Sequence, residues 1–439
     1  MKGRAARGRP RGTATRPATL LALLGLASAL GGCDRLFSYA SRRPSGADGN
    51  LLLDASADLR SQETRGPELR PPDARRHDAS PCRGPTLGLA VAANYAHACS
   101  VAIDRRLYCW GNNDNGQLGL GDATSRAVPS PVGTATWSRT SLGWWHTCGI
   151  QSDGSLWCWG ANDDGRLGLG DTQDRRLPVR VNGGPWLVVT ASNAHTCGLR
   201  TGGALSCWGG NTEGQLGLGH LKNVSAPTPV GTTTYASVAA GAHHTCAVAS
   251  DGSLSCWGLN NAGQLGREGS ATEPAPRRVG DARDWATVSA GAYHSCALTT
   301  SRALYCWGSD SSGQTGLGVG TTVSAPQQVS PGTRWLAVSA GSFHTCALRD
   351  DGGLYCWGRN TRGALGTGDL VDRPAPTLAN NSRAWLAVAA GSDHTCATVA
   401  DLVYCWGANE LGQLGLGDSL DRPRPVPICP VAPPPSPAP

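Results

Sequence analysis

The sequence predicts an all-β fold built from seven repeated units, and three observations indicate it. A Cys-Trp-Gly motif recurs every 49 or 50 residues, with its tryptophans at Trp110, Trp159, Trp208, Trp257, Trp307, Trp357 and Trp406. A histidine precedes each of these tryptophans by 12 or 13 residues, at His97, His146, His195, His244, His294, His344 and His394. The chain also holds 60 glycines and 29 prolines, which suit short strands joined by tight turns. A fixed period of this size indicates an array of one supersecondary unit.

The sixth unit shows the strand plan that the others share. Residues 335–340 are expected to form a strand, residues 341–343 a turn, residues 344–348 a second strand and residues 354–357 a third. A glycine-rich loop follows. A proline-flanked segment, such as residues 325–329 of the preceding unit, is expected as the fourth strand. Four short strands in about 50 residues suit one blade of a β-propeller.

The first 32 residues resemble a secretory signal, with a basic start and an apolar run at residues 20–30 that is too short to span a membrane. Residues 30–33, Leu-Gly-Gly-Cys, resemble a bacterial lipobox, which implies cleavage before Cys33 and acylation of that cysteine. An ordinary signal peptide followed by a chance cysteine is the alternative. We therefore expect an extracytoplasmic protein, anchored by lipid to a bacterial cell membrane that is either the inner or the outer one.

Composition divides the rest of the chain into three parts. Residues 33–81 are rich in Arg, Asp, Pro, Ser and Gly, and we expect a disordered tether there. Residues 82–429 form the repeat block. Residues 430–439 are a proline-rich tail, expected to be extended.

The net charge of +6 is concentrated at the amino terminus. Six of the 38 basic residues lie in the first 16, and the remaining 32 are matched by 32 acidic residues. A nucleic-acid-binding protein normally shows a basic footprint in its composition. No such footprint remains once the signal is removed, so we expect no nucleic-acid partner.

The repeats contain 14 of the 17 cysteines, two in each repeat. In six repeats they are ten residues apart, and a three-residue hairpin loop with a left-handed glycine, such as residues 250–252, sets them opposite each other. A two-residue loop at residues 400–401 does the same for the nine-residue spacing of the last repeat. Opposed residues lie within disulfide range, and an exported protein meets an oxidising compartment. The predicted disulfides are Cys99–Cys109, Cys148–Cys158, Cys197–Cys207, Cys246–Cys256, Cys296–Cys306, Cys346–Cys356 and Cys396–Cys405.

Cys82 and Cys429 flank the repeats, and a disulfide between them would join the first blade to the last. Metal binding is the competing interpretation, because His344, Cys346 and Cys356 could supply three ligands in one blade. The spacing of zinc sites, such as C-x-x-C, is absent, so we expect no metal and no other cofactor. Each repeated histidine is instead expected to anchor a turn by hydrogen bonds from the side chain to the backbone.

The repeated motif, H-T-C-A-L…D-G…L-Y-C-W-G followed by G-x-N-x-x-G-Q-L-G, resembles the repeat of the regulator of chromosome condensation family. Good copies of its second half are residues 111–119, 160–168, 209–217 and 407–415. The resemblance implies a seven-bladed β-propeller with four-stranded blades. It also implies nucleotide exchange on a small nuclear GTPase, through a wedge-like hairpin inserted in the propeller. No repeat exceeds 50 residues, which leaves no room for that hairpin, and we discount this activity.

No nucleophile elbow or phosphate-cradling loop occurs, and we expect no enzyme activity. Aspartates near the Gly-Gln-Leu-Gly motifs fit structural turns better than ion loops. The two residues before each repeated histidine vary while their surroundings are fixed, so we expect them to ring one face. The predicted partner-binding residues there are Tyr95, Trp144, Trp145, His243, Tyr293, Phe343 and Asp393. Filling of the channel mouth by these rings is the equally weighted alternative.

The sequence therefore predicts a non-catalytic module that binds an unknown protein, or a cell-envelope polymer, on one propeller face. A secreted-type enzyme inhibitor is the first alternative, because a bacterial β-lactamase inhibitor has a similar propeller. A glycan-active enzyme is a weaker one, because Asp393 is the only acid among the variable turn positions.

Overall fold

The computed structural model describes residues 87–380 and 384–429, which contain 27 β-strands. Within these residues no helix is long and apolar enough to cross a membrane. The predicted signal, Cys33, the tether, Cys82 and the proline-rich tail lie outside the described residues. The predictions about them are therefore carried forward as proposals.

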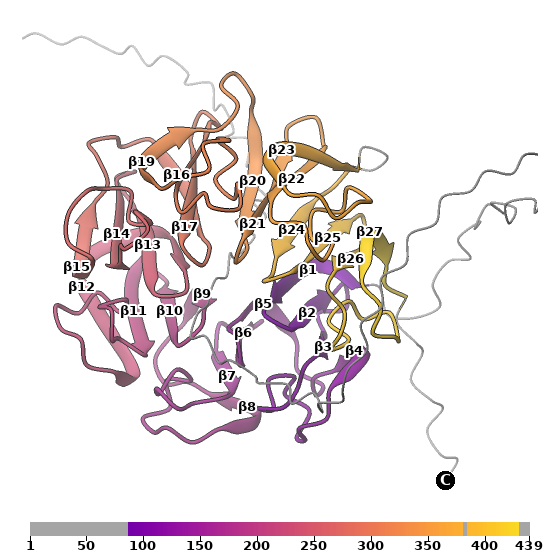
Figure 1. Ribbon diagram of the computed structural model, residues 1–439. Helices are drawn as coiled ribbons and strands as arrows, with labels where there is room; N and C mark the ends of the chain where they lie inside the picture. Colours follow the sequence, from indigo (N-terminus) through magenta and orange to yellow (C-terminus); the bar gives the residue numbers. More distant parts are fainter. Residues whose placement is uncertain (1–86, 381–383, 430–439) are drawn as a thin grey trace, which may run out of the picture.

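The strands form seven four-stranded antiparallel units, which we call blades 1 to 7, arranged in a ring (Figure 1). Blade 1 contains β1 (Leu87–Asn94), β2 (His97–Ala102), β3 (Leu107–Gly111) and β4 (Arg126–Pro131). Blade 2 contains β5 (Trp137–Leu142), β6 (His146–Gln151), β7 (Leu156–Gly160) and β8 (Arg175–Arg180). Blade 3 contains β9 (Trp186–Ala191), β10 (His195–Arg200), β11 (Ala204–Gly209) and the first part of β12 (Val224–Ala240).

Blade 4 takes the second part of β12, with β13 (His244–Ala249), β14 (Leu254–Leu259) and β15 (Thr272–Arg278). Blade 5 contains β16 (Trp285–Ala290), β17 (His294–Thr299), β18 (Leu304–Gly308) and β19 (Val323–Gln328). Blade 6 contains β20 (Trp335–Ala340), β21 (His344–Arg349), β22 (Leu354–Gly358) and β23 (Arg373–Asn380). Blade 7 contains β24 (Ala387–Ala390), β25 (His394–Val399), β26 (Leu402–Gly407) and β27 (Arg422–Pro427). The predicted all-β fold of four-stranded blades is confirmed.

The long strand β12 makes one blade-to-blade connection different from the rest. Its start pairs with β11 of blade 3, where Cys207 lies opposite Thr228. Its end pairs with β13 of blade 4, where Tyr235 lies opposite Ala249. Blades 3 and 4 therefore share one strand of 17 residues, whereas the other connections are loops.

The hairpin between the second and third strands sets the cysteines opposite each other, as the spacing requires. Cys246 pairs with Cys256 in the register, and Gly252 in the loop has a φ of 80°. Arg105 and Arg302 adopt the same left-handed conformation, with φ of 65° and 69°, so these two loops keep the shared geometry without glycine.

The cysteines of all seven pairs are bonded in the structure, with Cα atoms 4.1 Å apart in each pair. The predicted pairs are thus compatible with disulfides. Cys429 is also disulfide-bonded, and its predicted partner lies outside the described residues.

The core lies between the blades. The Cys-Trp-Gly tryptophans are fully buried, and each indole donates to a main-chain carbonyl of the preceding blade. Trp159 Nε1, for example, donates to Gln117 O at 2.9 Å, and its ring meets Trp137 edge-on at a centroid distance of 5.6 Å. Burial of a large ring together with its polar N–H satisfies both parts of the side chain.

The last blade contacts the first in the same way that each blade contacts the next. Gly170 N of blade 2 donates to Ser225 O of blade 3 at 2.8 Å, and Gly417 N of blade 7 donates to Ala127 O of blade 1 at 2.8 Å. Among the described strands, those of blade 1 and blade 7 come from two separate stretches of chain, and neither blade borrows a strand from the other.

Candidate functional site

The turns between the first and second strands of the blades gather around the ring axis, and we call them the mouth turns. They comprise residues 95–96, 144–145, 193–194, 242–243, 292–293, 342–343 and 392–393. Neighbouring turns are hydrogen-bonded. Trp144 N donates to Ser192 O at 3.3 Å, and Ser342 N donates to Gly391 O at 3.1 Å. The sequence positions that vary most are therefore brought together on one face.

The two positions of a mouth turn differ in exposure. Six of the seven second positions are half-buried, and these are Trp145, Ala194, His243, Tyr293, Phe343 and Asp393. The first positions are buried in blades 4 to 7, where they hold only small residues, namely Ala242, Ala292, Ser342 and Ser392. In blade 1 the first position is Tyr95, which is 42% exposed.

Trp144 differs from the prediction of an exposed partner-binding residue, because only 6% of it is exposed. Its ring stacks on Tyr95 at a centroid distance of 4.9 Å and meets Trp145 edge-on at 5.2 Å. Trp144 therefore packs against neighbouring rings and offers little surface to a partner, while Tyr95 and Trp145 keep accessible surface.

An arginine covers part of this aromatic cluster. The guanidinium carbon of Arg166 lies 5.9 Å from the centre of the Trp145 ring, and Arg166 itself is 3% exposed. Its Nη2 donates to Asp164 Oδ2 at 2.8 Å. A buried arginine that is paired with a carboxylate and an aromatic face holds its neighbours in place.

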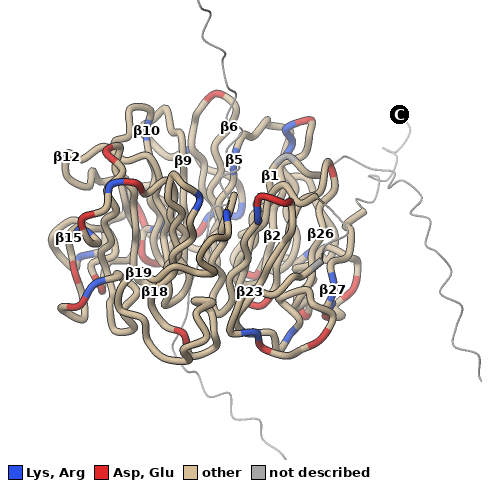
Figure 2. Tube along the Cα trace, turned by 90° about the horizontal axis from the view of Figure 1, so that it is seen from above, with Lys and Arg blue, Asp and Glu red and all other residues tan. Residues whose placement is uncertain are grey.

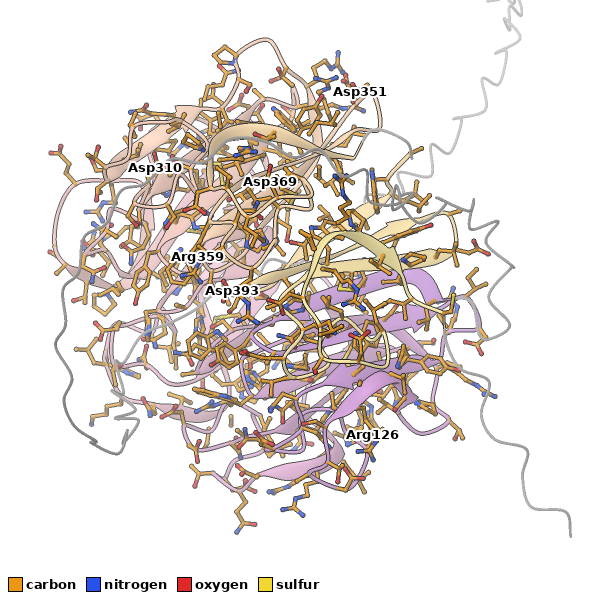
Figure 3. All side chains as sticks on the ribbon, turned by 45° about the vertical axis from the view of Figure 1, so that its right-hand side comes forward. Arg126, Asp310, Asp351, Arg359, Asp369 and Asp393 are labelled. Carbon is orange, nitrogen blue, oxygen red and sulfur yellow. A yellow bond between two sulfur atoms is a disulfide. The ribbon has the colours of Figure 1, made fainter. Side chains whose placement is uncertain are left out.

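A second group of the same composition lies between blades 6 and 7. The Arg359 guanidinium lies 4.0 Å from the centre of the Phe343 ring, and its Nη2 donates to Asp393 Oδ1 at 2.5 Å. Figure 3 shows Arg359 and Asp393 side by side. Two predicted face residues, Phe343 and Asp393, are thus tied to each other through one arginine.

The charged residues of the described chain are mixed in sign and lie mainly in the loops (Figure 2). His243 in its mouth turn faces Glu213 of the preceding loop. Burial lowers the pKa of His243, and the Glu213 carboxylate acts in the opposite direction.

The repeated histidines contact turns in two blades: a backbone hydrogen bond joins His344 to Ser392 in the next mouth turn, and His195 Nδ1 contacts Ser192 Oγ at 3.0 Å. Six of them contact a hydroxyl of the next blade through Nε2, as in His97 to Thr147 at 3.0 Å and His294 to Thr345 at 2.8 Å. All seven are buried, and burial lowers their pKa, to about 3 for His97 and well below the ordinary value for His146. These histidines are therefore neutral groups in the interface between blades, where six of them contact a hydroxyl side chain of the next blade.

Sequence reasoning missed the two arginines. Arg166 stands where most repeats have glutamine in the Gly-Gln-Leu-Gly motif, and that departure from the repeat was a readable signal. Arg359 directly follows the Cys-Trp-Gly motif, where five of the other six repeats have Ala, Gly, Ser or Asn. Within the described residues, no three His, Cys, Asp or Glu side chains are grouped closely enough to hold a metal ion.

Comparison with known families identifies the architecture. Residues 180–433 match the model of the RCC1-like domain. The chain belongs to the RCC1-like family. Residues 104–150 and 153–199 match the regulator of chromosome condensation (RCC1) repeat, and a second model of this repeat matches residues 89–117 and 137–166. RCC1-type sequence therefore extends over all seven blades, as the repeated motif indicates.

Solved RCC1 structures show the same ring. Yeast RCC1 (Prp20) bound to Kap60 is 25% identical, with a TM-score of 0.66 over 73% of this chain and 83% of that chain. The structure of Prp20p from Saccharomyces cerevisiae, reported with its binding to Gsp1p and histones, is 25% identical, with a TM-score of 0.66 over 78% and 87%. Human WBSCR16, 22% identical, shares the fold with a TM-score of 0.63 over 70% and 85%.

Proposed function

We propose that this RCC1-like propeller is a non-catalytic protein-interaction module, held outside the cytoplasm at a bacterial membrane by a lipid on Cys33. The observation that carries the proposal is the row of half-buried second positions on the mouth turns. Trp145, Tyr293 and Phe343 offer aromatic surface on three blades of one face, and aromatic side chains dominate many binding hot spots.

The environment of these rings supports a binding role over simple filling of the channel. Trp144 is buried against Tyr95 and Trp145, whereas Trp145, Tyr293 and Phe343 remain half-buried and keep accessible surface. Trp145 and Phe343 are each held by an arginine, at 5.9 and 4.0 Å from the ring centres. Rings that are fixed before a partner arrives lose little conformational freedom on binding.

The relatives agree with this class of function. Yeast RCC1 (Prp20) has been solved bound to Kap60, and Prp20p binds Gsp1p and histones. By analogy we expect a protein partner for this chain, although an exported chain would meet different proteins. The fold supports the general role, and the partner must be found by experiment.

The interaction face can be tested by cross-linking in intact cells, affinity purification and quantitative mass spectrometry. The test variant carries Trp145→Ala, Tyr293→Ala and Phe343→Ala. A matched control carries Leu187→Ala, Leu336→Ala and Leu386→Ala, which are exposed leucines at the other ends of the blades. We expect the test variant to lose its cross-linked partner about tenfold or more and the control to retain it. Equal recovery from both variants would refute the mouth-turn face.

The anchor is tested separately, on the mature protein. We expect mass spectrometry to show an amino-terminal Cys33 that carries acyl chains, and globomycin to cause the uncleaved precursor to accumulate. A mature chain that is cut elsewhere, or that carries an unmodified Cys33, would remove the membrane anchor from the proposal and leave the interaction face intact.

A further inference from the structure

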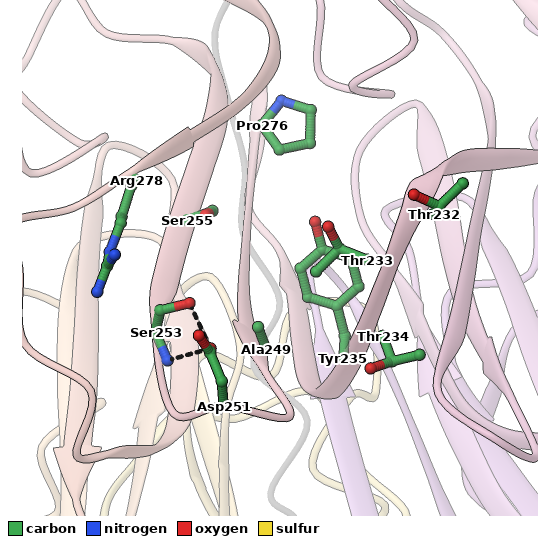
Figure 4. A pocket seen from close by; sticks show the side chains of 10 residues that line it. All are labelled: Thr232, Thr233, Thr234, Tyr235, Ala249, Asp251, Ser253, Ser255, Pro276 and Arg278. Carbon is green, nitrogen blue, oxygen red and sulfur yellow. Dashed lines mark hydrogen bonds between the residues drawn. The ribbon is translucent and has the colours of Figure 1, made fainter.

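An open depression of about 560 Å³ lies on blade 4, away from the mouth turns (Figure 4). Its lining comes from the middle of the shared strand β12, the β13–β14 hairpin and strand β15. The lining residues are Thr232, Thr233, Thr234, Tyr235, Ala249, Asp251, Ser253, Ser255, Pro276 and Arg278. The mouth turn of blade 4 and this depression lie at opposite ends of β13, so the two sites are separate.

Three positions of blade 4 that line this depression differ from their counterparts in blade 6. Tyr235 stands where blades 2, 3, 5, 6 and 7 have tryptophan. Ser255 stands where blades 1, 2, 5, 6 and 7 have tyrosine or tryptophan, and in blades 5 to 7 that ring packs edge-on against the tryptophan. Ala249 stands where blade 6 has Arg349, whose guanidinium lies 4.7 Å from the Tyr355 ring. All three positions of blade 4 hold smaller side chains, and together they leave open a space that is filled in blade 6.

The lining is rich in hydroxyl groups. Thr232, Thr233 and Thr234 are three consecutive exposed residues of β12. Ser253 of the hairpin loop and Ser255 of β14 lie on the opposite side of the depression (Figure 4). Hydroxyl groups both donate and accept hydrogen bonds, so they match a ligand that presents hydroxyls of its own. Ala249 and Pro276 add an apolar floor, which suits the C–H face of a sugar ring.

The charges at the rim are already engaged within the protein. Asp251 accepts from the backbone N–H and hydroxyl of Ser253, at 3.0 and 2.6 Å, and pairs with Arg283. Arg278 donates to Asp281 O at 3.0 Å. The lining carries one acidic and one basic side chain, Asp251 and Arg278, so a charged ligand would gain no net attraction from them. The lining also contains a single carboxylate, so it lacks the two carboxylates that most glycoside hydrolases use.

From this geometry we propose that the blade 4 depression binds a neutral saccharide, one or two hexose units of a glycan. The volume is within the range of small-molecule sites, and the hydroxyl lining with partnered charges favours a neutral polyol. The site is independent of the mouth turns, so the same propeller would hold a glycan at one end of its blades and a protein at the other.

The experiment uses the intact chain and a panel of neutral disaccharides, namely maltose, cellobiose and N,N′-diacetylchitobiose, with a sulfated disaccharide for comparison. Saturation-transfer NMR and calorimetry measure binding. We expect at least one neutral sugar to bind with a Kd on the order of 1 mM, as for an open site with few contacts. The absence of binding by all neutral sugars, or binding of the sulfated sugar alone, would overturn the proposal.

The test variant is Ser255→Tyr combined with Ala249→Arg, which places the blade 6 residues in blade 4. It should fold, because blade 6 holds the same pair at the same register. We expect binding to weaken tenfold or more. Thr232→Val and Thr234→Val, on an exposed stretch, provide a second pair that removes hydroxyls with little change of shape. Unchanged affinity in both variants would show that the sugar binds elsewhere and would refute the site.

Discussion

The indole Nε1 of Trp110 donates to the main-chain oxygen of Gln413 at 3.0 Å, which joins residues 303 positions apart. The equivalent bond is present at the remaining six junctions between neighbouring blades, as in Trp257 to Gln215 at 2.9 Å. The junction between blade 7 and blade 1 therefore has the same Trp-to-carbonyl hydrogen bond as the other junctions. One component is missing at this junction. Ala98 occupies the position where the other six blades carry threonine or serine, and His394 Nε2 is buried without a hydrogen-bond partner.

Ala98→Thr should strengthen the junction between blades 7 and 1. The new hydroxyl would stand where Thr147 stands in blade 2, and Thr147 contacts both His97 and Gln117 O. It would thus satisfy His394 Nε2, and we expect the free energy of unfolding to rise by about 1 kcal/mol in urea denaturation. Thr147→Ala, the reverse change at an intact junction, should lower it by about 1–3 kcal/mol. If both variants lost stability, the proposed weakness at Ala98 would be wrong.

The blade disulfides should contribute to stability one at a time. Cys246→Ala with Cys256→Ala opens one bond in blade 4, and we expect a loss of about 2–3 kcal/mol, because the closed loop is short. Denaturation of the variant against wild type gives this value. Non-reducing mass spectrometry of the natively purified protein supplies the control, and free thiols at these positions would show that the bonds do not form.

Acid should destabilise the propeller well before its carboxylates titrate. In the folded state burial lowers the pKa of His244 and His294 from the ordinary value of 6.5 to about 3. The unfolded chain thus binds more protons below about pH 6.5, and each such histidine costs about 1.4 kcal/mol of stability per pH unit from there down to its folded pKa. We expect unfolding free energies measured from pH 8 to pH 5 to be flat at first and then to fall steeply.

A variant pair separates these histidines from other acid effects. His294→Asn should reduce the pH slope by about one proton, whereas Leu187→Ala, at an exposed position without a titratable group, should leave it unchanged. Equal stability of the wild-type protein at pH 7 and pH 5 would contradict the neutral, buried state of the histidines.

The two adjacent rings of the mouth cluster should respond differently to truncation. Trp144→Ala removes a side chain that is 6% exposed, and we expect a loss of about 3 kcal/mol or more. Tyr95→Ala removes a ring that is 42% exposed and should cost about 1 kcal/mol or less. Thermal unfolding of the two variants measures the difference. Similar losses of stability in the two variants would contradict the buried, packed position of Trp144.

The strand plan was readable from the sequence because it depends on short-range patterns. The expected strand at residues 335–340 matches β20, and loop length alone sets Cys246 opposite Cys256. Contacts between blades were not readable in the same way, because Thr147 is 50 residues from His97. The burial of Trp144 likewise depends on a contact with Tyr95, which lies in the preceding blade. A comparison of equivalent positions in the repeats would have revealed the blade 4 depression, since Tyr235, Ala249 and Ser255 are all visible there.

Each terminal blade is one uninterrupted stretch of chain, and this has a consequence for how the ring can be re-engineered. Among the described residues, no strand of blade 1 comes from the carboxyl-terminal end of the repeats, and no strand of blade 7 comes from the amino-terminal end. The ring should therefore form whichever blade comes first in the chain. A circular permutant that opens new termini at Gly133, between blades 1 and 2, and connects blade 7 to blade 1 by a linker should assemble the same ring. The shared strand β12 is the exception, since a cut there would sever two blades at once.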